Sequence, residues 1–471
     1  MTLHWRHRKS LGGPEPKSLN AWAHELQISN LLARLLWHRG LTTPEDMEIF
    51  LSPGLRHLPP LEQWPALLHC AELLSTEVTQ SKTVAIWGDY DADGITATAI
   101  LIDFFKRRGI PAQPHIPERL QQGYGLNIDG LNQLKSQGVD LVITVDCGIS
   151  NIEEVEAARE IGQQVFITDH HLPGDRLPQA RAIVNPCLGT CPYPHASGAA
   201  VAFLLAAALN RMLPGEPVDI REYLDLAALG TIADIVELNT TNRILVKNGL
   251  LCLGEARRPG IFALKEISKL PPTAPMGSGQ VSFGLAPRIN AAGRMGSPEE
   301  ALKLLLAPDL STARPLAAAL EKHNQERRRV EKKTIEEASQ QAESMPDALG
   351  LVLYQQDWHK GIVGIAASRV VEQFNRPALL LTQDGDRLTG SGRSIPDFDL
   401  YQGLQGCSHL LLNYGGHRMA AGLSLHETEL ESLRTVFNKS VHSCFGDCLP
   451  PPAVELDAEL NLGQVDLTLV Q

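Results

Sequence analysis

The sequence lacks any long hydrophobic run. No apolar stretch reaches the roughly 18 residues that a membrane-spanning helix needs. The segment Met1–Ser10 is polar and basic, without the apolar core of a secretory signal. These absences predict a cytoplasmic protein with no membrane partner.

Cysteine is sparse, and its spacing matches no common metal motif. The chain has eight cysteines, and two pairs are spaced C-x3-C, Cys187/Cys191 and Cys444/Cys448. Structural zinc sites usually combine two C-x2-C pairs, and no such combination is present. We therefore expect reduced thiols rather than a zinc site or a disulfide framework.

Positive charge and aromatic residues are also in short supply. The net charge is −12, and only 5% of residues are aromatic. Such a balance argues against a broadly basic nucleic-acid-binding surface. However, a carboxylate-rich metal site counts as negative until its ions are added, and the sequence has local basic runs at 106–108 and 327–329. Each run by itself is typical of a solvated helix face. The charge therefore does not exclude a nucleic-acid substrate.

The length of 471 residues exceeds one ordinary domain. From residue 83 onward, short apolar runs alternate with helical patterns, which predicts a parallel sheet covered on both faces. The predicted strands are 83–87, 141–145, 164–168 and 182–184, and the predicted helices are 95–108, 152–161, 198–213 and 221–230.

The second half repeats this alternation after two different segments. Residues 268–297 are rich in Gly and Pro, which predicts a loop. Residues 313–343 are polar and free of Gly, which predicts a long helix that bridges two domains through solvent. Further strands are predicted at 350–354, 378–382 and 388–391, and a further helix at 362–374.

Four acidic or histidine clusters each follow an apolar segment. One Asp after a strand is commonly a turn or capping residue, but three strand ends tipped in this way are harder to explain as caps. Because carboxyl ends of parallel strands meet at one sheet edge, these side chains should converge. Carboxylates and imidazoles suit Mn²⁺ or Mg²⁺, and there are enough of them for two ions. The clusters are Gly88–Gly94 (GDYDADG), Asp146–Gly148 (DCG), Asp169–His171 (DHH) and Ala233–Asp234.

These segments, in this order, resemble the four motifs of the DHH phosphoesterase family. The RecJ branch of that family is the most similar, on the form GDYDADG and on Pro287–Gly296 (PRINAAGRMG), Ser391–Ser394 (SGRS) and Gly415–His417 (GGH). The matches run from residue 83 to about residue 425.

The resemblance implies a two-lobed α/β fold. A parallel-sheet DHH domain would be joined by a long helix to a smaller α/β substrate-binding domain of the DHHA1 type. The implied parts are an N-terminal helical segment at 1–80, a metal-binding catalytic domain at 81–300, a connecting helix at 301–345, a DHHA1-like domain at 346–440, and at 441–471 the start of a C-terminal OB-fold region that would be truncated.

The resemblance also implies roles for the clusters. His171 would lie beside two Mn²⁺ or Mg²⁺ ions and contact the scissile phosphate. Many family members have a His where this chain has Trp87, so Asp89 is a candidate for an additional ligand. The implied metal ligands are Asp91, Asp93, Asp146, His170 and Asp234.

Substrate contacts are implied in both halves of the chain. Arg pairs two phosphate oxygens through its planar fork, and a glycine pair lets the backbone approach a phosphate closely. The implied contacts to a 5′-phosphate are Arg119, Arg288, Ser391 and Arg393, and those to the sugar-phosphate chain are Gly415, Gly416 and His417.

The activity implied is a metal-dependent 5′-to-3′ exonuclease that hydrolyses single-stranded DNA to mononucleotides in DNA repair and recombination. Its partners would be single-stranded DNA, a single-strand-binding protein and a helicase. Two alternatives stay open. One is a DHH-family phosphodiesterase that acts on short oligonucleotides or cyclic dinucleotides, and the other is a catalytically silent homologue that binds DNA or the replisome.

Overall fold

The structure is a computed structural model that describes residues 4–80, 83–118 and 123–465. The chain packs into two units. The larger unit is Ile49–Glu326, and the smaller unit combines Met1–Glu48 with Arg327–Gln471. Among the described residues, no helix combines the length and the apolar character that crossing a membrane requires.

A five-stranded parallel sheet forms the centre of the larger unit, which confirms the predicted sheet. Its order is β3-β2-β4-β5-β6, and every neighbouring pair is parallel. Edge strand β3 was not predicted, because it is short, partly exposed and interrupted by Pro114. The strands are β2 (Val84–Gly88), β3 (Ala112–His115), β4 (Leu141–Val145), β5 (Gln164–Thr168) and β6 (Ala182–Val184).

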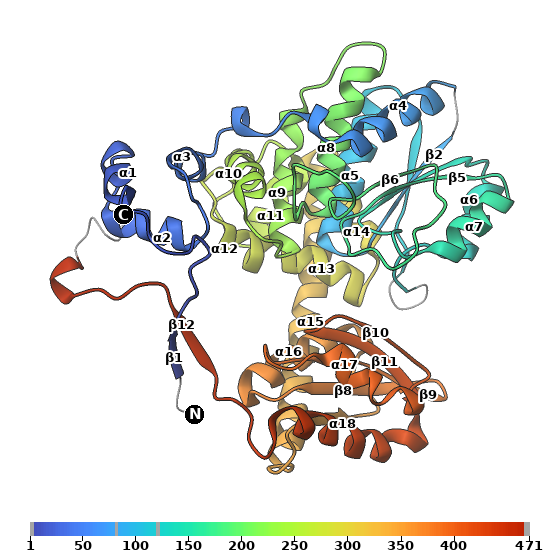
Figure 1. Ribbon diagram of the computed structural model, residues 1–471. Coiled ribbons are helices and arrows are strands. Elements are labelled where there is room, and N and C mark those ends of the chain that lie inside the picture. The colour runs from blue at the N-terminus through green and yellow to red at the C-terminus, as the bar shows by residue number, and fades with distance from the viewer. Residues whose placement is uncertain (1–3, 81–82, 119–122, 466–471) are drawn as a thin grey trace. The chain divides into compact units, whose positions relative to one another are not determined.

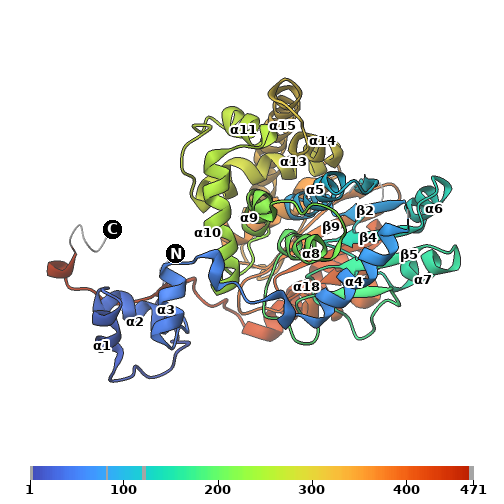
Figure 2. The same ribbon diagram turned by 90° about the horizontal axis from the view of Figure 1, so that it is seen from above.

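Helices cover both faces of this sheet (Figures 1 and 2). Alternate side chains of β2 face opposite layers: Val84 and Ile86 belong to one hydrophobic cluster, Ala85 and Trp87 to another. This two-sided burial explains why the strands read as nearly continuous apolar runs. The first layer contains α4 (Pro65–Thr79), α5 (Ala92–Arg107) and α8 (Gly198–Met212), and the second contains α6 (Ile128–Ser136) and α7 (Ile152–Glu160).

Helix α9 (Leu224–Ala233) is buried on all sides, with every residue from Leu224 to Ile232 enclosed. It packs against α5, α8 and α10 (Thr240–Glu255). A helix that is apolar all round belongs inside a protein, so α9 brings the residue at its C-terminal end, Asp234, close to the sheet edge. Helices α11 (Pro259–Ile267) and α14 (Pro298–Leu305) extend the same core.

The loop predicted for residues 268–297 is wrong over its second half. That stretch contains the short α12 (Ser278–Gln280), a π-helical turn at Val281–Leu285, and helix α13 (Ala286–Met295). Pro287 lies in the first turn of α13, where no N–H is needed for the helix. Gly293 is needed for packing, because a Cβ there would lie 2.5 Å from the carbonyl oxygen of Tyr90. The Pro and Gly residues, which predicted a loop by their frequency, thus have structural roles inside this helix.

The smaller unit has a five-stranded mixed sheet of order β10-β11-β9-β8-β7, in which only β7 and β8 are parallel neighbours. Its strands are β7 (Leu351–Tyr354), β8 (Ala378–Asp384), β9 (Arg387–Arg393), β10 (Asn413–Gly416) and β11 (Ala420–His426). Its helices include α16 (Lys360–Phe374), α17 (Leu400–Gln405) and α18 (Leu430–Phe445).

The predicted long helix is present as α15 (Leu310–Glu343), which begins in the larger unit and continues into the smaller one. The N-terminal residues form short helices as predicted, namely α1 (Leu19–Glu25), α2 (Asn30–His38) and α3 (Pro44–Leu51). Strand β1 (His4–His7) pairs in parallel with β12 (Ala453–Leu456).

Candidate metal centre

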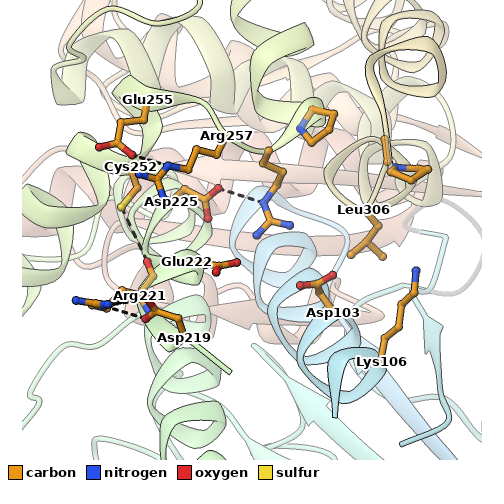
Figure 3. Close-up of a pocket in the computed structure, with 14 residues that line it drawn as sticks. Asp103, Lys106, Asp219, Arg221, Glu222, Asp225, Cys252, Glu255, Arg257 and Leu306 are labelled. Atoms are coloured by element: carbon orange, nitrogen blue, oxygen red, sulfur yellow. Dashed lines mark hydrogen bonds and ion pairs between the residues drawn. The ribbon is translucent and has the colours of Figure 1, made fainter. Parts of the chain in front are cut away.

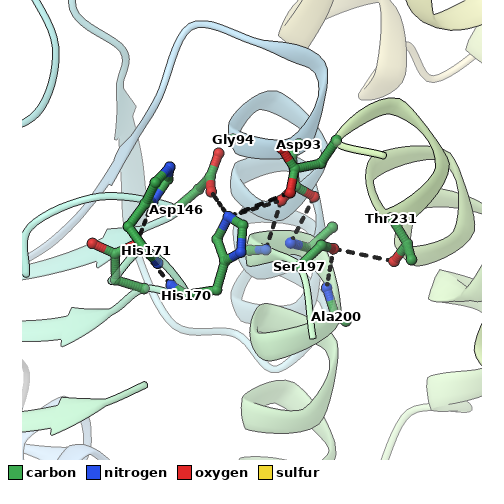
Figure 4. Close-up of polar contacts among 12 residues, drawn as sticks. Asp93, Gly94, Asp146, His170, His171, Ser197, Ala200 and Thr231 are labelled. Atoms are coloured by element: carbon green, nitrogen blue, oxygen red, sulfur yellow. Dashed lines mark hydrogen bonds and ion pairs between the residues drawn. The ribbon is translucent and has the colours of Figure 1, made fainter. Parts of the chain in front are cut away.

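The carboxyl ends of the central strands bring acidic and histidine side chains together. Asp146 follows β4 directly, and His170 lies just beyond β5. The Nε2 atom of His170 is 2.9 Å from Asp146 Oδ1, 3.8 Å from Asp93 Oδ2 and 3.6 Å from Asp234 Oδ2. In Figure 4 the His170 ring lies between Asp146 and Asp93. Four of the five predicted ligands therefore converge from four separate segments of the larger unit.

The fifth predicted ligand belongs to an adjoining group. Oxygen atoms of Asp89, Asp91 and Asp146 lie within 4.8 Å of one another. Asp146 therefore belongs both to this group and to the group around His170. Two neighbouring ligand sets that share one carboxylate are the arrangement that two close divalent ions require.

Asp93 is held by the start of a helix. Its side chain is 1% exposed, and it accepts hydrogen bonds from the backbone N–H groups of Gly198 (2.6 Å) and Ala199 (3.0 Å), the first residues of α8. The N-terminus of a helix favours negative charge through these N–H groups and its dipole. The carboxylate is thereby fixed at the sheet edge.

Asp91 is the N-cap residue of α5. Its Oδ1 accepts hydrogen bonds from the N–H groups of Asp93 (2.9 Å) and Gly94 (3.1 Å), so Oδ2 is the oxygen left for an ion. The next N–H, of Ala92, donates to Asn290 Oδ1 at 2.7 Å. Asn290 belongs to the PRINAAGRMG segment, which therefore supports the metal-ligand loop from helix α13. This role of Asn290 was not predicted from the sequence.

Asp146 has an unusual backbone conformation, with φ of 62°. Residues other than Gly seldom adopt it, and when they do they cluster at functional sites. The space around Asp146 is also tight, because a Cβ on Gly198 would lie 2.5 Å from Asp146 Cβ. Backbone and packing together fix the direction in which this carboxylate points.

The electrostatics of the cluster call for a cation. Burial, together with the neighbouring carboxylates, raises the pKa of both Asp93 and Asp146 well above the ordinary value. Burial and the charge of Asp91 raise the pKa of Asp234 to about 7. Asp234 is also the C-cap of α9, the helix end whose dipole disfavours an anion.

Two buried atoms of the cluster lack a hydrogen bond of acceptable geometry. They are His170 Nε2 and Asp146 Oδ1, although these atoms lie only 2.9 Å apart. Buried polar atoms without hydrogen bonds are uncommon and call for an explanation such as an ion. Carboxylate oxygens with an imidazole nitrogen form a donor set that suits Mn²⁺ or Mg²⁺, so these residues fit a divalent metal centre.

Asp169 orients the second histidine of the DHH motif. The Asp169 side chain is 1% exposed, and its Oδ1 accepts from the Nδ1 of His171 at 2.8 Å, while its Oδ2 accepts from the N–H of Ile149 at 2.9 Å. Burial opposes charge on Asp169, but its hydrogen bonds and the charge of His171 lower its pKa. Burial alone would lower the pKa of His171, but Asp169 and nearby carboxylates raise it to about 9. The sequence signal for this role is an Asp two residues before a His.

Trp87 supplies no ligand. Its side chain is fully buried in the layer of α6 and α7, its indole N–H donates to the carbonyl of Gly125 at 3.2 Å, and its ring lies 4.0 Å from the His115 ring. Asp89 lies within the group around Asp91 and Asp146, so it stays a candidate for an additional ligand.

The residues predicted to contact phosphate in the larger unit gain no support. Arg119 lies outside the described residues. Arg288 is 7% exposed, forms an ion pair with Glu321 at 2.6 Å and donates to the carbonyl of Gly284 at 2.5 Å. A buried, paired guanidinium of this kind favours a structural role in fixing α13 against α15.

The predicted contacts in the smaller unit lie on β9 and β10, the two strands that flank β11. Ser391 and Arg393 are on β9 beside α16, because a Cβ on Gly364 would lie 3.3 Å from Ser391 Oγ and 3.2 Å from Arg393 Nη2. Gly415 and Gly416 end β10, with φ of 142° at Gly416, and exposed His417 begins the turn to β11. Since β11 pairs with both β9 and β10, the SGRS and GGH segments lie on either side of the first residues of β11, at the same end of these strands.

A cavity of about 690 Å³ lies at the other end of α5 (Figure 3). It is lined by Asp103 and Lys106 from that helix, and its other charges largely pair with one another. Examples are Arg258 with Asp225 at 3.1 Å and Arg221 with Asp219 at 2.7 Å. The cavity is separate from the metal centre, and its internal ion pairs leave little charge for a ligand.

Comparison with known proteins places these features in a family. The model described as "DHH family, N-terminal domain" matches residues 83–231, and the DHHA1 domain model matches residues 348–443. The single-stranded-DNA-specific exonuclease RecJ of Bacillus subtilis is 36% identical over 464 residues, which cover 97% of this chain and 58% of that protein. RecJ of Salmonella typhimurium is 36% identical over 466 residues, which cover 94% of this chain and 80% of that protein.

Solved structures agree. The structure of RecJ in complex with Mn²⁺ from Thermus thermophilus superposes with a TM-score of 0.82 at 34% identity and covers 96% of this chain. An exonuclease RecJ bound to manganese gives a TM-score of 0.72 at 37% identity, and 97% of that chain is covered. The present chain spans 64% of the Thermus structure and 58% of the Bacillus protein. On these similarities, the chain belongs to the RecJ family.

Proposed function

We propose that this chain is a divalent-metal-dependent exonuclease that degrades single-stranded DNA from the 5′ end to mononucleotides. The observation that carries the proposal is the convergence of Asp93, Asp146 and Asp234 on His170 Nε2 within 3.8 Å. Two relatives that match more than nine-tenths of this chain are named single-stranded-DNA-specific exonucleases, and two related structures contain Mn²⁺ or Mg²⁺.

In this proposal two Mn²⁺ or Mg²⁺ ions occupy the cluster. Bound there, the ions would supply the positive charge that stabilises phosphoryl displacement. The side chains that would hold them are Asp91, Asp93, Asp146, His170 and Asp234, with Asp89 as an additional candidate.

The protein's own contribution is positioning and charge. The N–H groups of Gly198 and Ala199 hold Asp93, and the left-handed turn at Asp146 aims its carboxylate. Asp169 holds the Nδ1–H of His171, which leaves Nε2 as the ring nitrogen that faces substrate. His171 would thus bind the scissile phosphate next to the ions, where fixed dipoles are most effective.

The smaller unit would bind the DNA chain. Arg393 and Ser391 offer a guanidinium and a hydroxyl to a terminal phosphate, beside the first turns of α16. The exposed Gly415–Gly416 backbone and His417 would contact the sugar-phosphate chain from the β10–β11 turn. Such an enzyme would act in the cytoplasm in DNA repair and recombination, with a single-strand-binding protein and a helicase as partners.

The test is hydrolysis of a 5′-phosphorylated single strand of about 30 nucleotides in Mn²⁺, with a radiolabelled 5′-phosphate in one reaction and a 3′ fluorophore in another. We expect early release of 5′-labelled mononucleotide, slow loss of the 3′ label, and no cleavage in excess chelator. Duplex DNA of the same sequence, a linear dinucleotide and a cyclic dinucleotide are the competing substrates.

Asp146→Asn should abolish the activity. Asp219→Asn is the matched control, because this carboxylate is paired with Arg221 at the cavity of Figure 3, at the other end of α5. Faster turnover of a dinucleotide than of the long strand would favour the small-substrate phosphodiesterase. DNA binding without cleavage in either metal would favour the silent homologue.

A further inference from the structure

Tyr124 contacts two residues of the candidate metal centre. Its hydroxyl is 3.1 Å from the carbonyl oxygen of Asp146 and 3.1 Å from Nδ1 of His171. Its ring meets the His171 ring edge to face, with centroids 5.6 Å apart. Tyr124 therefore contacts both a metal-ligand residue and the histidine that would face the phosphate.

The hydrogen positions in this network follow from its chemistry. The Asp169 carboxylate serves as an acceptor, so the Nδ1 of His171, 2.8 Å from Asp169 Oδ1, carries the proton. The Tyr124 oxygen then accepts from the same Nδ1–H, and its own hydrogen is donated to the carbonyl of Asp146. His171 is thus held by two acceptors on one nitrogen, and within the described part of the chain its Nε2 remains available.

The loop that carries Tyr124 is anchored by Trp87. Gly123 and Gly125 flank Tyr124 with φ of 80° and 81°, conformations that suit glycine. The carbonyl of Gly125 accepts the indole N–H of Trp87 at 3.2 Å. Asn151 binds the loop on the C-terminal side of Gly125, where its Oδ1 accepts a hydrogen bond from the N–H of Leu126 at 3.3 Å. Trp87, which is not a metal ligand, thereby fixes the residue that contacts His171.

We propose that Tyr124 is a positioning residue for His171, held over the metal centre by the hydrogen bond between Trp87 and Gly125. It fixes the plane of the imidazole so that Nε2 meets the scissile phosphate. This inference rests on the proposed function, because it names the residue that prepares His171 for that substrate. It predicts that the Tyr124 hydroxyl matters for turnover rather than for metal binding.

The first test is Tyr124→Phe, which removes the hydroxyl and keeps the ring. With saturating Mn²⁺ and 5′-phosphorylated single-stranded DNA, we expect kcat to fall about 5- to 20-fold, the effect of one orienting hydrogen bond. KM and the Mn²⁺ affinity by titration calorimetry should change less than about twofold. Trp87→Phe, which removes the hydrogen bond to Gly125, should also lower kcat. Tyr223→Phe, which removes a hydroxyl bonded to Asp103 at 2.8 Å, is the matched control and should leave kcat unchanged.

The decisive comparison is a double-mutant cycle with His171→Asn, measured under single-turnover conditions with excess enzyme. If Tyr124 acts through His171, Tyr124→Phe should cause no further loss in the His171→Asn background. An equal loss in both backgrounds would overturn the inference, as would a loss of Mn²⁺ affinity that matches the loss of kcat. Either result would show that Tyr124 acts on the ligand set instead.

A structural readout keeps this inference separate from the proposed function. Crystal structures of the Mg²⁺-loaded wild type and Tyr124→Phe should differ in the orientation or order of the His171 ring. An unchanged ring with unchanged kcat would refute the role of Tyr124 alone. An inactive wild type would refute the proposed function, while the two crystal structures would still decide whether Tyr124 positions His171.

Discussion

Replacing Asp234 by Asn should stabilise the metal-free protein at pH 8. The Asp234 side chain is 25% exposed, and its Oδ2 is 3.6 Å from His170 Nε2. Burial first, and then the charge of Asp91, raise its pKa from 3.8 to about 7. Without a cation, the folded protein therefore carries a carboxylate that its surroundings oppose.

The direction in which stability changes with pH follows from proton binding. Between pH 4 and pH 7 the folded protein retains a proton that the unfolded chain has released, so stability falls as pH rises through this interval. At about 1.4 kcal/mol per pH unit, the cost reaches about 4 kcal/mol at pH 8. Because nearby carboxylates titrate together with Asp234, we expect Asp234→Asn to recover about 2–4 kcal/mol at pH 8 and about 1 kcal/mol at pH 5.

Metal should reverse the ranking of the two proteins. An ion that binds only the folded protein at 100 times its Kd stabilises it by about 2.7 kcal/mol. Asp234→Asn would lose a proposed ligand, so most of this gain should disappear in the variant. Asp234→Asn would then have a higher free energy of unfolding than the wild type in chelator and a lower one in Mn²⁺.

The assay is urea unfolding followed by circular dichroism, in chelator and in Mn²⁺, at pH 5 and pH 8. Asp219→Asn is the control with the opposite sign, because a hydrogen bond from Arg221 lowers the pKa of Asp219. The reasoning fails if Asp234→Asn destabilises the metal-free protein at pH 8, or if its effect is the same at both pH values.

Three further predictions concern other parts of the site. Asp146→Ala and His170→Ala should each reduce Mn²⁺-dependent hydrolysis more than about 100-fold, beyond the loss expected for a residue that only supports a ligand. Melting temperatures in chelator should not fall, because burial opposes the charge of Asp146 in the metal-free protein; a loss of folding that accounts for the loss of activity would contradict this. Gly198→Ala places a Cβ 2.5 Å from Asp146 Cβ, so calorimetry should show weaker Mn²⁺ binding than in Gly174→Ala, whose added Cβ meets nothing within 4 Å. Arg393→Ala should reduce the ratio of kcat/KM for 5′-phosphorylated over 5′-hydroxyl strands without changing Mn²⁺ affinity, and an unchanged ratio would remove Arg393 from the phosphate site.

The central sheet was predictable because its strands are buried on both faces. The runs at 141–145, 164–168 and 182–184 match β4, β5 and β6 residue for residue. Strand β3 lacks this burial on both faces, because it is a partly exposed edge strand that contains a proline. Helix α13 was not predicted because it contains Pro and Gly. Pro287 fits the first turn of the helix, and Gly293 allows close contact with Tyr90. Both reasons are visible only in the folded chain.

The convergence of the candidate ligands was predictable from the sequence, whereas the residues that hold them in place were not. Parallel strand ends share an edge, so Asp146 and His170 had to approach each other and did so within 2.9 Å. The supports of the cluster come from elsewhere in the chain, namely the start of α8 for Asp93 and Asn290 for the N–H of Ala92. Neither carries a pattern that points to a metal, since a Ser-Gly helix start and a single Asn are common in any protein.

The two faces of β2 decide what position 87 can contribute. Ile86 faces the layer that contains α5 and α8, which carry and hold Asp93, whereas Trp87 faces α6 and α7. From that side a long aromatic side chain reaches the carbonyl of Gly125. Position 87 thus contributes to the site through the loop of Tyr124. Trp87 therefore supplies no ligand, and in the inference above it anchors the loop of the residue that contacts His171.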